Sequence, residues 1–168
     1  MNIDLAAIFD AHHAGLYRYL VRLVGDPDLA ADAAQEAFLR LSQRPPHTTQ
    51  NLRAWLYTVA TNYAFDTIKV ARRRAEILQE TPDQAPLAAP AVTPDVSLER
   101  QERCQAVRIA LDGLREKERT TLLMRAEGFS YREIAAALDI SSNSVGVVAA
   151  RALRKLAGVL QPYEVSLR

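Results

Sequence analysis

Residues 128–156 read GFSYREIAAALDISSNSVGVVAARALRKL. Within this stretch Ser130 and Glu133 have the spacing of a capping box, in which each side chain accepts a hydrogen bond from the other residue's backbone N–H. We therefore expect a short helix over 131–138 and, after a tight turn, a long helix from 142 to about 160. The stretch predicts that its half of the chain is helical.

The turn at residues 139–141 has the chemistry of a helix-turn-helix. Asp139 stands where glycine is usual, and Asp tolerates the left-handed conformation better than most residues. Ala135 is small where the two helices must approach closely, and Ile140 and Val145 flank the turn as apolar core residues. In a helix-turn-helix the second helix lies in the major groove of DNA. The simpler alternative is an ordinary helical hairpin in a bundle.

Two further helices are expected upstream of this stretch. One starts near Ser97 and carries apolar residues at helical spacing: Cys104, Val107, Leu111 and Leu114. Because Cys104, the single cysteine of the chain, lies on this stripe, we expect it to be a buried structural thiol. The other helix covers 116–126 and ends at Gly128, a residue suited to a left-handed C-cap.

A proline-rich stretch before these helices is the clearest break in the sequence. Prolines recur every four residues at Pro82, Pro86, Pro90 and Pro94, and residues 75–99 hold five acids and no base. Proline at this spacing cannot continue a helix and favours an extended, semi-stiff linker. We predict an all-α fold with two small helical domains, residues 1–75 and 98–162, joined by a flexible acidic linker over 76–97. The helix-turn-helix occupies about 130–150.

Three helices are expected in the first half. The first spans about 3–24 and has apolar residues at helical spacing: Ile3, Leu5, Ile8, Leu16, Leu20 and Leu23. Gly25 ends it, Asp26 and Pro27 cap a second helix that runs to about Ser42, and Pro45-Pro46 follows. A third helix runs from near Asn51 through Arg74, and its expected buried stripe is Leu52, Leu56, Val59 and Tyr63.

The second helix has two contrasting faces. Its apolar stripe is Ala30, Ala33, Ala37 and Leu41, and its polar stripe is Asp28, Asp32, Gln35, Glu36 and Leu39. Like charges four residues apart destabilise an isolated helix by about 0.2–0.5 kcal/mol per pair. The polar stripe is therefore either a solvated face or a surface matched to a basic partner.

The third helix shows residue types that suit nucleic acid. One face holds Trp55, Thr58, Asn62, Phe65, Lys69 and Arg73, and the cluster Arg72, Arg73 and Arg74 lies at its end. Aromatic rings stack on unpaired bases, an amide can read a base edge, and arginines hold phosphates. The alternative is that the aromatic residues belong to the core.

Composition limits the class of protein. The chain has 168 residues, a mass of 18.7 kDa and 49% hydrophobic residues, which suits a globular protein of one domain or two small ones. Of 21 basic residues, three are lysine and 18 are arginine, which reflects either a GC-rich genome or phosphate binding. No apolar run is long enough to span a membrane, and the acidic start is unlike a secretory signal. We expect a cytoplasmic protein.

An enzyme is the main alternative class, and the sequence contains little that supports it. There is no Gly-rich phosphate loop, no nucleophile elbow and no Cys/His metal spacing. His12 and His13 are adjacent, so on a helix they point about 100° apart and are poorly placed to ligate one metal. We expect a solvated pair, no metal, no cofactor and no catalytic residue.

Three stretches together resemble the bacterial extracytoplasmic-function (ECF) sigma factors, in family order and at family spacing. Residues 32–40 resemble the polymerase-binding helix, residues 55–62 with Asp66 and the arginine run resemble the promoter-opening helix, and residues 130–156 resemble the C-terminal helix-turn-helix. The resemblance implies a sigma factor that binds core RNA polymerase and directs promoter-specific transcription initiation. The closest rival is a stand-alone helix-turn-helix regulator that does not bind polymerase.

The resemblance also implies roles for individual residues. The clamp helices of the largest polymerase subunit would contact Asp28, Asp32, Gln35, Glu36, Leu39 and Arg40. The minus-ten promoter element would contact Trp55, Thr58, Asn62, Phe65, Lys69, Arg72, Arg73 and Arg74, with Asn62 and the loop before Trp55 capturing a flipped base. The minus-thirty-five element would contact Tyr131, Arg132, Ser142, Asn143, Ser144, Arg151, Arg154 and Lys155. Further expected partners are the polymerase flap and an anti-sigma factor.

Two departures from the family pattern stand out. Where the family usually carries several basic or polar groups near the start of the recognition helix, this chain has Gly146, Val147, Val148 and Ala150. The reading of the minus-thirty-five element is therefore expected to be weak or unusual, and a polymerase-bound factor without sequence-specific reading is a third hypothesis. The loop over 43–50 is short and lacks the aromatic and glycine often seen there.

Overall fold

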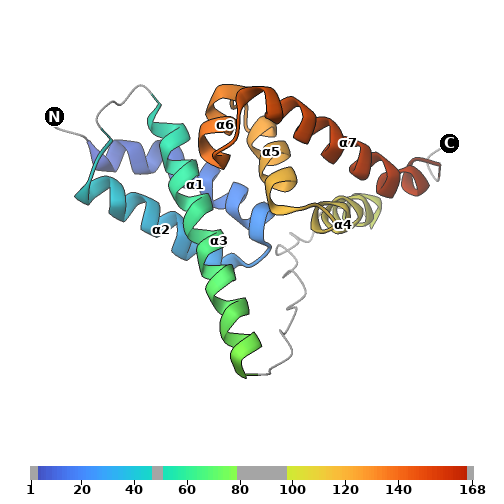
Figure 1. Ribbon diagram of the computed structural model, residues 1–168, viewed down its shortest axis with the longest axis horizontal. Helices are drawn as coiled ribbons and strands as arrows, with labels where there is room; N and C mark the ends of the chain where they lie inside the picture. The colour runs from blue at the N-terminus through green and yellow to red at the C-terminus, as the bar shows by residue number, and fades with distance from the viewer. Residues whose placement is uncertain (1–3, 47–50, 79–97, 166–168) are drawn as a thin grey trace. The chain divides into compact units, whose positions relative to one another are not determined.

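The computed structural model describes residues 4–46, 51–78 and 98–165 (Figure 1). Within these ranges every helix or strand assigned is an α-helix, which confirms the all-α fold class. The chain divides into two compact units, and the division falls inside residues 79–97. The prolines of the predicted linker lie outside the described residues.

The first unit contains α1 (Leu5–Val24), α2 (Pro27–Gln43) and α3 (Leu52–Leu78). The chain passes from α1 to α2 as the sequence predicts. Gly25 ends α1 with a left-handed φ of 73°, and the carboxylate of Asp26 accepts hydrogen bonds from the first backbone N–H groups of α2. The predicted third helix is longer than expected, since α3 continues through Leu78 and the first three residues of the predicted linker are helical.

The core of the first unit combines many alanines with leucines and a pair of tyrosines. Of the apolar residues noted in the first helix, Leu16, Leu20 and Leu23 are fully buried, whereas Ile8 is half-buried and Leu5 is exposed. Tyr19 lies against Tyr57 with ring centroids 4.8 Å apart, and its hydroxyl is 2.9 Å from the Thr61 hydroxyl in a buried hydrogen bond that ties α1 to α3.

The predicted buried stripe of α3 is wrong in part. Leu56 is buried, but Leu52, Val59 and Tyr63 are only half-buried. The buried positions of the helix are Ala54, Leu56, Tyr57, Ala60, Thr61 and Ala64. Small residues let α1 and α2 come close, so the helix turns its alanines toward them and leaves larger apolar residues at the edge.

Removing the Tyr19 hydroxyl tests this core contact. Tyr19→Phe is expected to lower the free energy of unfolding by about 1–2 kcal/mol, because the Thr61 hydroxyl stays buried and loses its partner. Urea denaturation followed by circular dichroism measures the change. Tyr17→Phe, at a half-buried position on the same helix, is the control. Equal losses in the two variants would contradict a specific role for the hydrogen bond.

The second unit contains α4 (Leu98–Asp112), α5 (Glu116–Ala126), α6 (Tyr131–Leu138) and α7 (Ser142–Val165). The other three helices all pack against α7. The predicted capping box is present, since Ser130 Oγ accepts from the Glu133 N–H and Glu133 Oε2 accepts from the Ser130 N–H. Asp139 adopts the left-handed conformation, with φ 50° and ψ 56°, and Gly128 also has a positive φ. The helix-turn-helix is confirmed as a local structure.

The prediction that Cys104 is a buried thiol is wrong, because the side chain is exposed. On α4, Val107 is exposed as well, while Ala106 and Ala110 are buried. As in α3, the helix packs through its alanines, and the larger residues that define the sequence stripe lie beside the contact. None of the described helices has the length and hydropathy that a membrane span requires.

Candidate functional site

The acidic stripe of α2 lies on the surface of the first unit. Its opposite stripe, Ala30, Ala33, Ala37 and Leu41, is buried against α1 and α3, so the helix is held by its alanines and turns its acids outward. Asp28, Asp32, Gln35 and Arg40 are exposed, Leu39 is 49% exposed and Glu36 is half-buried. The structure therefore brings all six candidate residues together on one face, with an apolar side chain among the charges.

The charges of this face are not equivalent. Glu36 Oε1 accepts a hydrogen bond from Arg40 Nε at 2.7 Å, one helical turn away. Such a surface pair contributes only about 0.3–0.5 kcal/mol, so a partner could replace it at little cost. Asp28 and Asp32 form no ion pair with any described residue and leave their negative charge available to a basic surface.

The candidate nucleic-acid face of α3 is less uniform. Asn62 is exposed, whereas Trp55, Thr58 and Phe65 are half-buried. Thr58 already donates its hydroxyl hydrogen to the Ala54 carbonyl at 2.8 Å. Trp55 and Phe65 are therefore partly accessible, and Asn62 lies between them on the same side of the helix.

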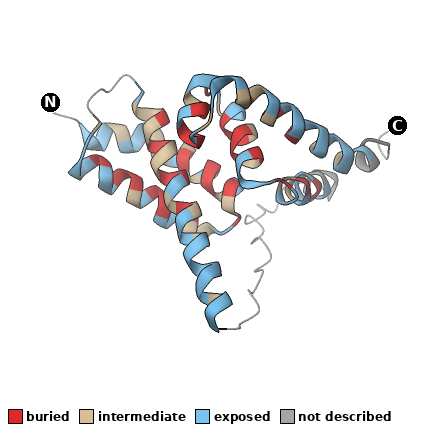
Figure 2. Ribbon diagram, in the orientation of Figure 1, coloured by how far each residue is buried: buried red, intermediate tan, exposed pale blue. Residues whose placement is uncertain are grey.

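The C-terminal part of α3 carries the basic residues. Lys69, Arg72, Arg73 and Arg74 are exposed. Figure 2 shows the lower half of this helix mostly in the pale blue of exposed residues. Successive helical residues point about 100° apart, so Arg73 continues the stripe of Asn62 and Lys69 while Arg72 and Arg74 flank it. The structure thus aligns the amide and the cations along one helix, which suits a nucleic-acid strand.

The recognition helix α7 presents a mixed face. Asn143, Val147, Ala150, Arg151 and Arg154 are exposed and lie within about 100° of one another around the helix axis. Val145, Ala149 and Ala152 are buried on the opposite side. Ser141 caps the start of the helix, since its Oγ accepts a hydrogen bond from the Ser144 N–H at 3.2 Å. Of the two other candidate serines, Ser142 is exposed and Ser144 is half-buried.

Tyr131 and Arg132, at the start of α6, are both exposed. Arg125 of α5 lies over the Tyr131 ring, 5.0 Å from its centroid, and donates to the Tyr131 hydroxyl at 2.6 Å. The ring also lies beside Gly146, where an added Cβ would be 3.6 Å from Tyr131 Cε2. Packing therefore leaves room for a methyl group at 146. The sequence pattern did not indicate the Arg125 contact.

Lys155 has a partner that the sequence did not predict. Its Nζ donates to Glu118 Oε2 at 2.7 Å, and the same oxygen accepts from the Arg115 backbone N–H at 3.0 Å. Glu118 is only 3% exposed. Burial opposes ionisation, but the hydrogen bonds from Lys155 and Arg115 and the nearby positive charges outweigh it and lower the pKa of Glu118. The position of glutamate, three residues after the N-cap of α5, was the one available signal.

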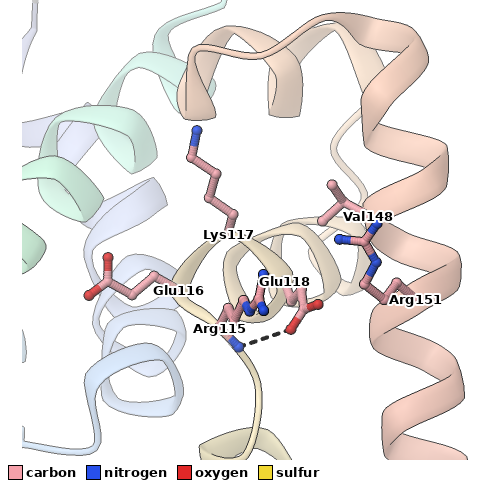
Figure 3. A pocket seen from close by; sticks show the side chains of 6 residues that line it. All are labelled: Arg115, Glu116, Lys117, Glu118, Val148 and Arg151. Atoms are coloured by element: carbon pink, nitrogen blue, oxygen red, sulfur yellow. Dashed lines mark hydrogen bonds between the residues drawn. The ribbon is translucent and has the colours of Figure 1, made fainter.

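A shallow pocket of about 470 Å³ lies beside this ion pair, between the start of α5 and the middle of α7. Figure 3 shows its lining residues, Arg115, Glu116, Lys117, Glu118, Val148 and Arg151. Three cations and two carboxylates line the same small space, so the pocket has no single charge preference that would define a ligand.

The histidines have a structural role in part. Both His12 and His13 are half-buried, so the expectation of a solvated pair is wrong, and His13 stacks on Phe9 with ring centroids 4.4 Å apart. Phe9 and His13 also lie against Phe38 of α2. Among the residues that the structure describes, no cluster of His, Cys, Asp or Glu could hold a metal ion.

Comparison with known proteins agrees with this arrangement. Residues 8–74 match Sigma-70 region 2, and residues 104–156 match Sigma-70, region 4. Among similar proteins, the ECF RNA polymerase sigma factor SigL of Mycobacterium tuberculosis is 33% identical, and the match covers 96% of this chain and 92% of SigL. The ECF RNA polymerase sigma factor SigX of Bacillus subtilis is 27% identical over 93% of this chain and 83% of SigX.

A solved structure shares the fold. The sigma factor RpoE of Bartonella quintana, in a co-crystal with the anti-sigma factor NepR, superposes with a TM-score of 0.75 at 23% identity, over 94% of this chain and 97% of that one. The two family matches cover both helical units, which the rival hypothesis of a stand-alone helix-turn-helix regulator does not explain. The chain belongs to the extracytoplasmic-function RNA polymerase sigma factors.

Proposed function

We propose that this sigma factor uses three exposed helix faces, each of which binds a different partner surface. In this scheme the acidic face of α2 docks on the clamp helices of the largest polymerase subunit, the Asn62 side of α3 captures the minus-ten element, and the start of α7 reads the minus-thirty-five element. The single observation that carries the scheme is that the six α2 candidates share one exposed face, while the alanines behind them hold the helix in the core.

The domain roles follow the same division. Residues 1–75 would bind the polymerase and open the minus-ten region, residues 76–97 would act as the linker, and residues 98–162 would contact the polymerase flap and duplex DNA. The five acids and absent bases of 75–99 suit a channel built for phosphates, since such a channel attracts carboxylates. The polymerase would perform the chemistry, so the chain itself needs no catalytic group, metal or cofactor.

Regulation by an anti-sigma factor is part of the proposal. The Bartonella quintana sigma factor that shares this fold was crystallised with one. Such a partner would cover the DNA-binding and polymerase-binding faces and hold the chain inactive. Because core polymerase and promoter DNA are its other partners, we propose that the protein acts in the bacterial cytoplasm and joins the nucleoid when bound to polymerase.

Substitution of Asn62 tests the minus-ten assignment. Asn62→Ala is expected to lower open-complex formation about 5- to 150-fold, because the lost amide contacts to an extruded base are worth about 1–3 kcal/mol. Closed-complex binding should change little. Permanganate reactivity of unpaired thymines measures opening, and a gel-shift assay on the same promoter measures closed binding.

Thr67→Ala, at another exposed position of α3, is the matched control and should open the promoter normally. Normal permanganate reactivity in Asn62→Ala would remove Asn62 from the opening step. An equal loss of closed binding would assign it to general DNA contact instead.

A further inference from the structure

Val147 is an apolar side chain at the centre of a surface expected to meet base edges. It is 58% exposed, and on the helix it falls midway around the exposed face, one turn after Asn143 and one turn before Arg151. Its neighbours Gly146 and Ala150 are small. The valine therefore presents more than half of its surface to solvent.

The position along the helix matters as much as the exposure. In a helix-turn-helix, the first turns of the second helix contact base edges. Val147 is the sixth residue of α7, whereas Arg151 and Arg154 lie later, where contacts to the phosphate backbone are more usual. On the exposed face defined above, the first two turns of α7 thus offer one polar side chain, Asn143, and one apolar side chain, Val147.

The thymine methyl group is the one group in the major groove with which an apolar side chain makes a favourable contact. Thymine projects its C5-methyl group there, whereas guanine, cytosine and adenine present hydrogen-bond donors and acceptors. An exposed valine beside these polar groups would leave them without partners, which costs free energy. Beside a methyl group it removes apolar surface from water, which is favourable.

We propose that Val147 is a specificity residue that reads a thymine methyl group in the duplex element bound by α7. The inference rests on the proposed function, because it requires α7 to lie in the major groove. This role for Val147 explains why the start of the helix has few basic groups. The element would be recognised through its shape and a methyl contact, while Arg151 and Arg154 in the next two turns contact the phosphate backbone.

Replacing thymine by deoxyuridine removes the methyl group and leaves base pairing unchanged. The probe is a promoter duplex enriched by the holoenzyme, assembled from the full chain and its cognate core polymerase, from a pool with a randomised upstream segment. Single deoxyuridine substitutions are then placed at each thymine of that segment. At one thymine the wild-type holoenzyme should lose about fourfold in affinity, the value of burying one methyl-sized group.

Two variants locate the effect. In Val147→Ala the penalty for deoxyuridine at that position should vanish, while the affinity for the deoxyuridine duplex stays close to that of wild type. Val159→Ala, at an exposed valine later in α7, is the matched control and should keep the fourfold penalty. Circular dichroism of both variants checks that the helix is intact.

The outcomes separate this inference from the proposed function. If the holoenzyme enriches no upstream sequence and binds the pool uniformly, the assignment of α7 to the minus-thirty-five element fails, and the inference fails with it. If it enriches a sequence but no deoxyuridine substitution matters, or the penalty persists in Val147→Ala, the inference alone is overturned.

Discussion

Reversing two charges on α2, by Asp32→Arg together with Glu36→Arg, is expected to weaken the binding of core polymerase about 100-fold, because like charges brought together at an interface cost several kcal/mol. Both side chains belong to the exposed acidic face, and Asp32 has no ion pair with a described residue. The Glu36 substitution also places an arginine one turn from Arg40, which destabilises the helix by only a few tenths of a kcal/mol. Fluorescence anisotropy of the labelled chain titrated with core enzyme measures the affinity.

The control keeps the same change in net charge. Asp10→Arg with Glu102→Arg reverses one exposed acid on α1 and one on α4, neither of which belongs to the α2 face. This variant should retain core affinity within about threefold, since it leaves every side chain of the proposed docking face unchanged, and salt screens long-range effects of net charge. If both double variants bind equally well, the acidic face of α2 is not the docking surface. If both bind equally poorly, net charge rather than position sets the affinity.

Lys155→Met is expected to destabilise the second unit by about 2 kcal/mol near neutral pH, because it leaves the carboxylate of Glu118 sheltered from water without its cation. The loss is smaller than that for a fully buried pair, since the Lys155 side chain is 40% exposed and the pair is partly screened by solvent. A unit of this size has only a few kcal/mol of stability in total. The variant should therefore show a clearly lower urea midpoint.

The pH dependence follows from the pKa of Glu118, which is lowered from an ordinary value of 4.5. A lowered carboxyl pKa contributes stability that is fully present above the ordinary value and is lost as the pH falls through the folded-state pKa. The deficit of Lys155→Met should therefore be largest near neutral pH and shrink as the pH falls toward 4.5 and below it. Urea denaturation at several pH values measures it.

Two further variants make the result specific. Arg154→Met removes an exposed cation from the neighbouring position and should cost less than about 0.5 kcal/mol. Adding Glu118→Gln to Lys155→Met removes the unpaired charge and should recover part of the loss. A deficit of Lys155→Met that is equal at every pH would mean that packing of the lysine stem, and not charge, accounts for it.

The sequence predicted the helices better than it predicted what they bury. Local signals are strong here: Asp26 and Pro27 start α2, Ser130 and Glu133 start α6, and Asp139 turns the chain. These signals act through a residue's own backbone and nearest neighbours, so they can be read without knowledge of the partners.

Buried faces depend on what packs against them, and this chain packs through alanine. A pattern of large apolar residues placed Val59 and Tyr63 of α3, and Cys104 and Val107 of α4, in the core. The actual contacts use small residues such as Ala60 and Ala106, because close approach of two helices favours them. A sequence with many alanines on several faces gives no signal of which face is used.

Some features of the candidate site could be predicted from the sequence, and others required the structure. The faces of α2 and α3 could be predicted because charged and polar residues at three- and four-residue spacing share a side of a helix wherever the helix packs. The role of Lys155 could not, because its partner Glu118 lies 37 positions earlier and meets it only when α5 packs on α7. The exposure of Val147 also required the structure, since it depends on which side of α7 the other helices cover.

The length of α3 also fixes a distance. Asn62 and Arg72 belong to one uninterrupted helix, which rises about 1.5 Å per residue, so their backbones are separated by roughly 15 Å along its axis. That is about the axial length of four to five base pairs. The rigid helix would then fix the distance between a base held by the Asn62 amide and a phosphate held by Arg72. One residue inserted between these positions would rotate the arginines by about 100° around the helix axis and move them out of register with the strand.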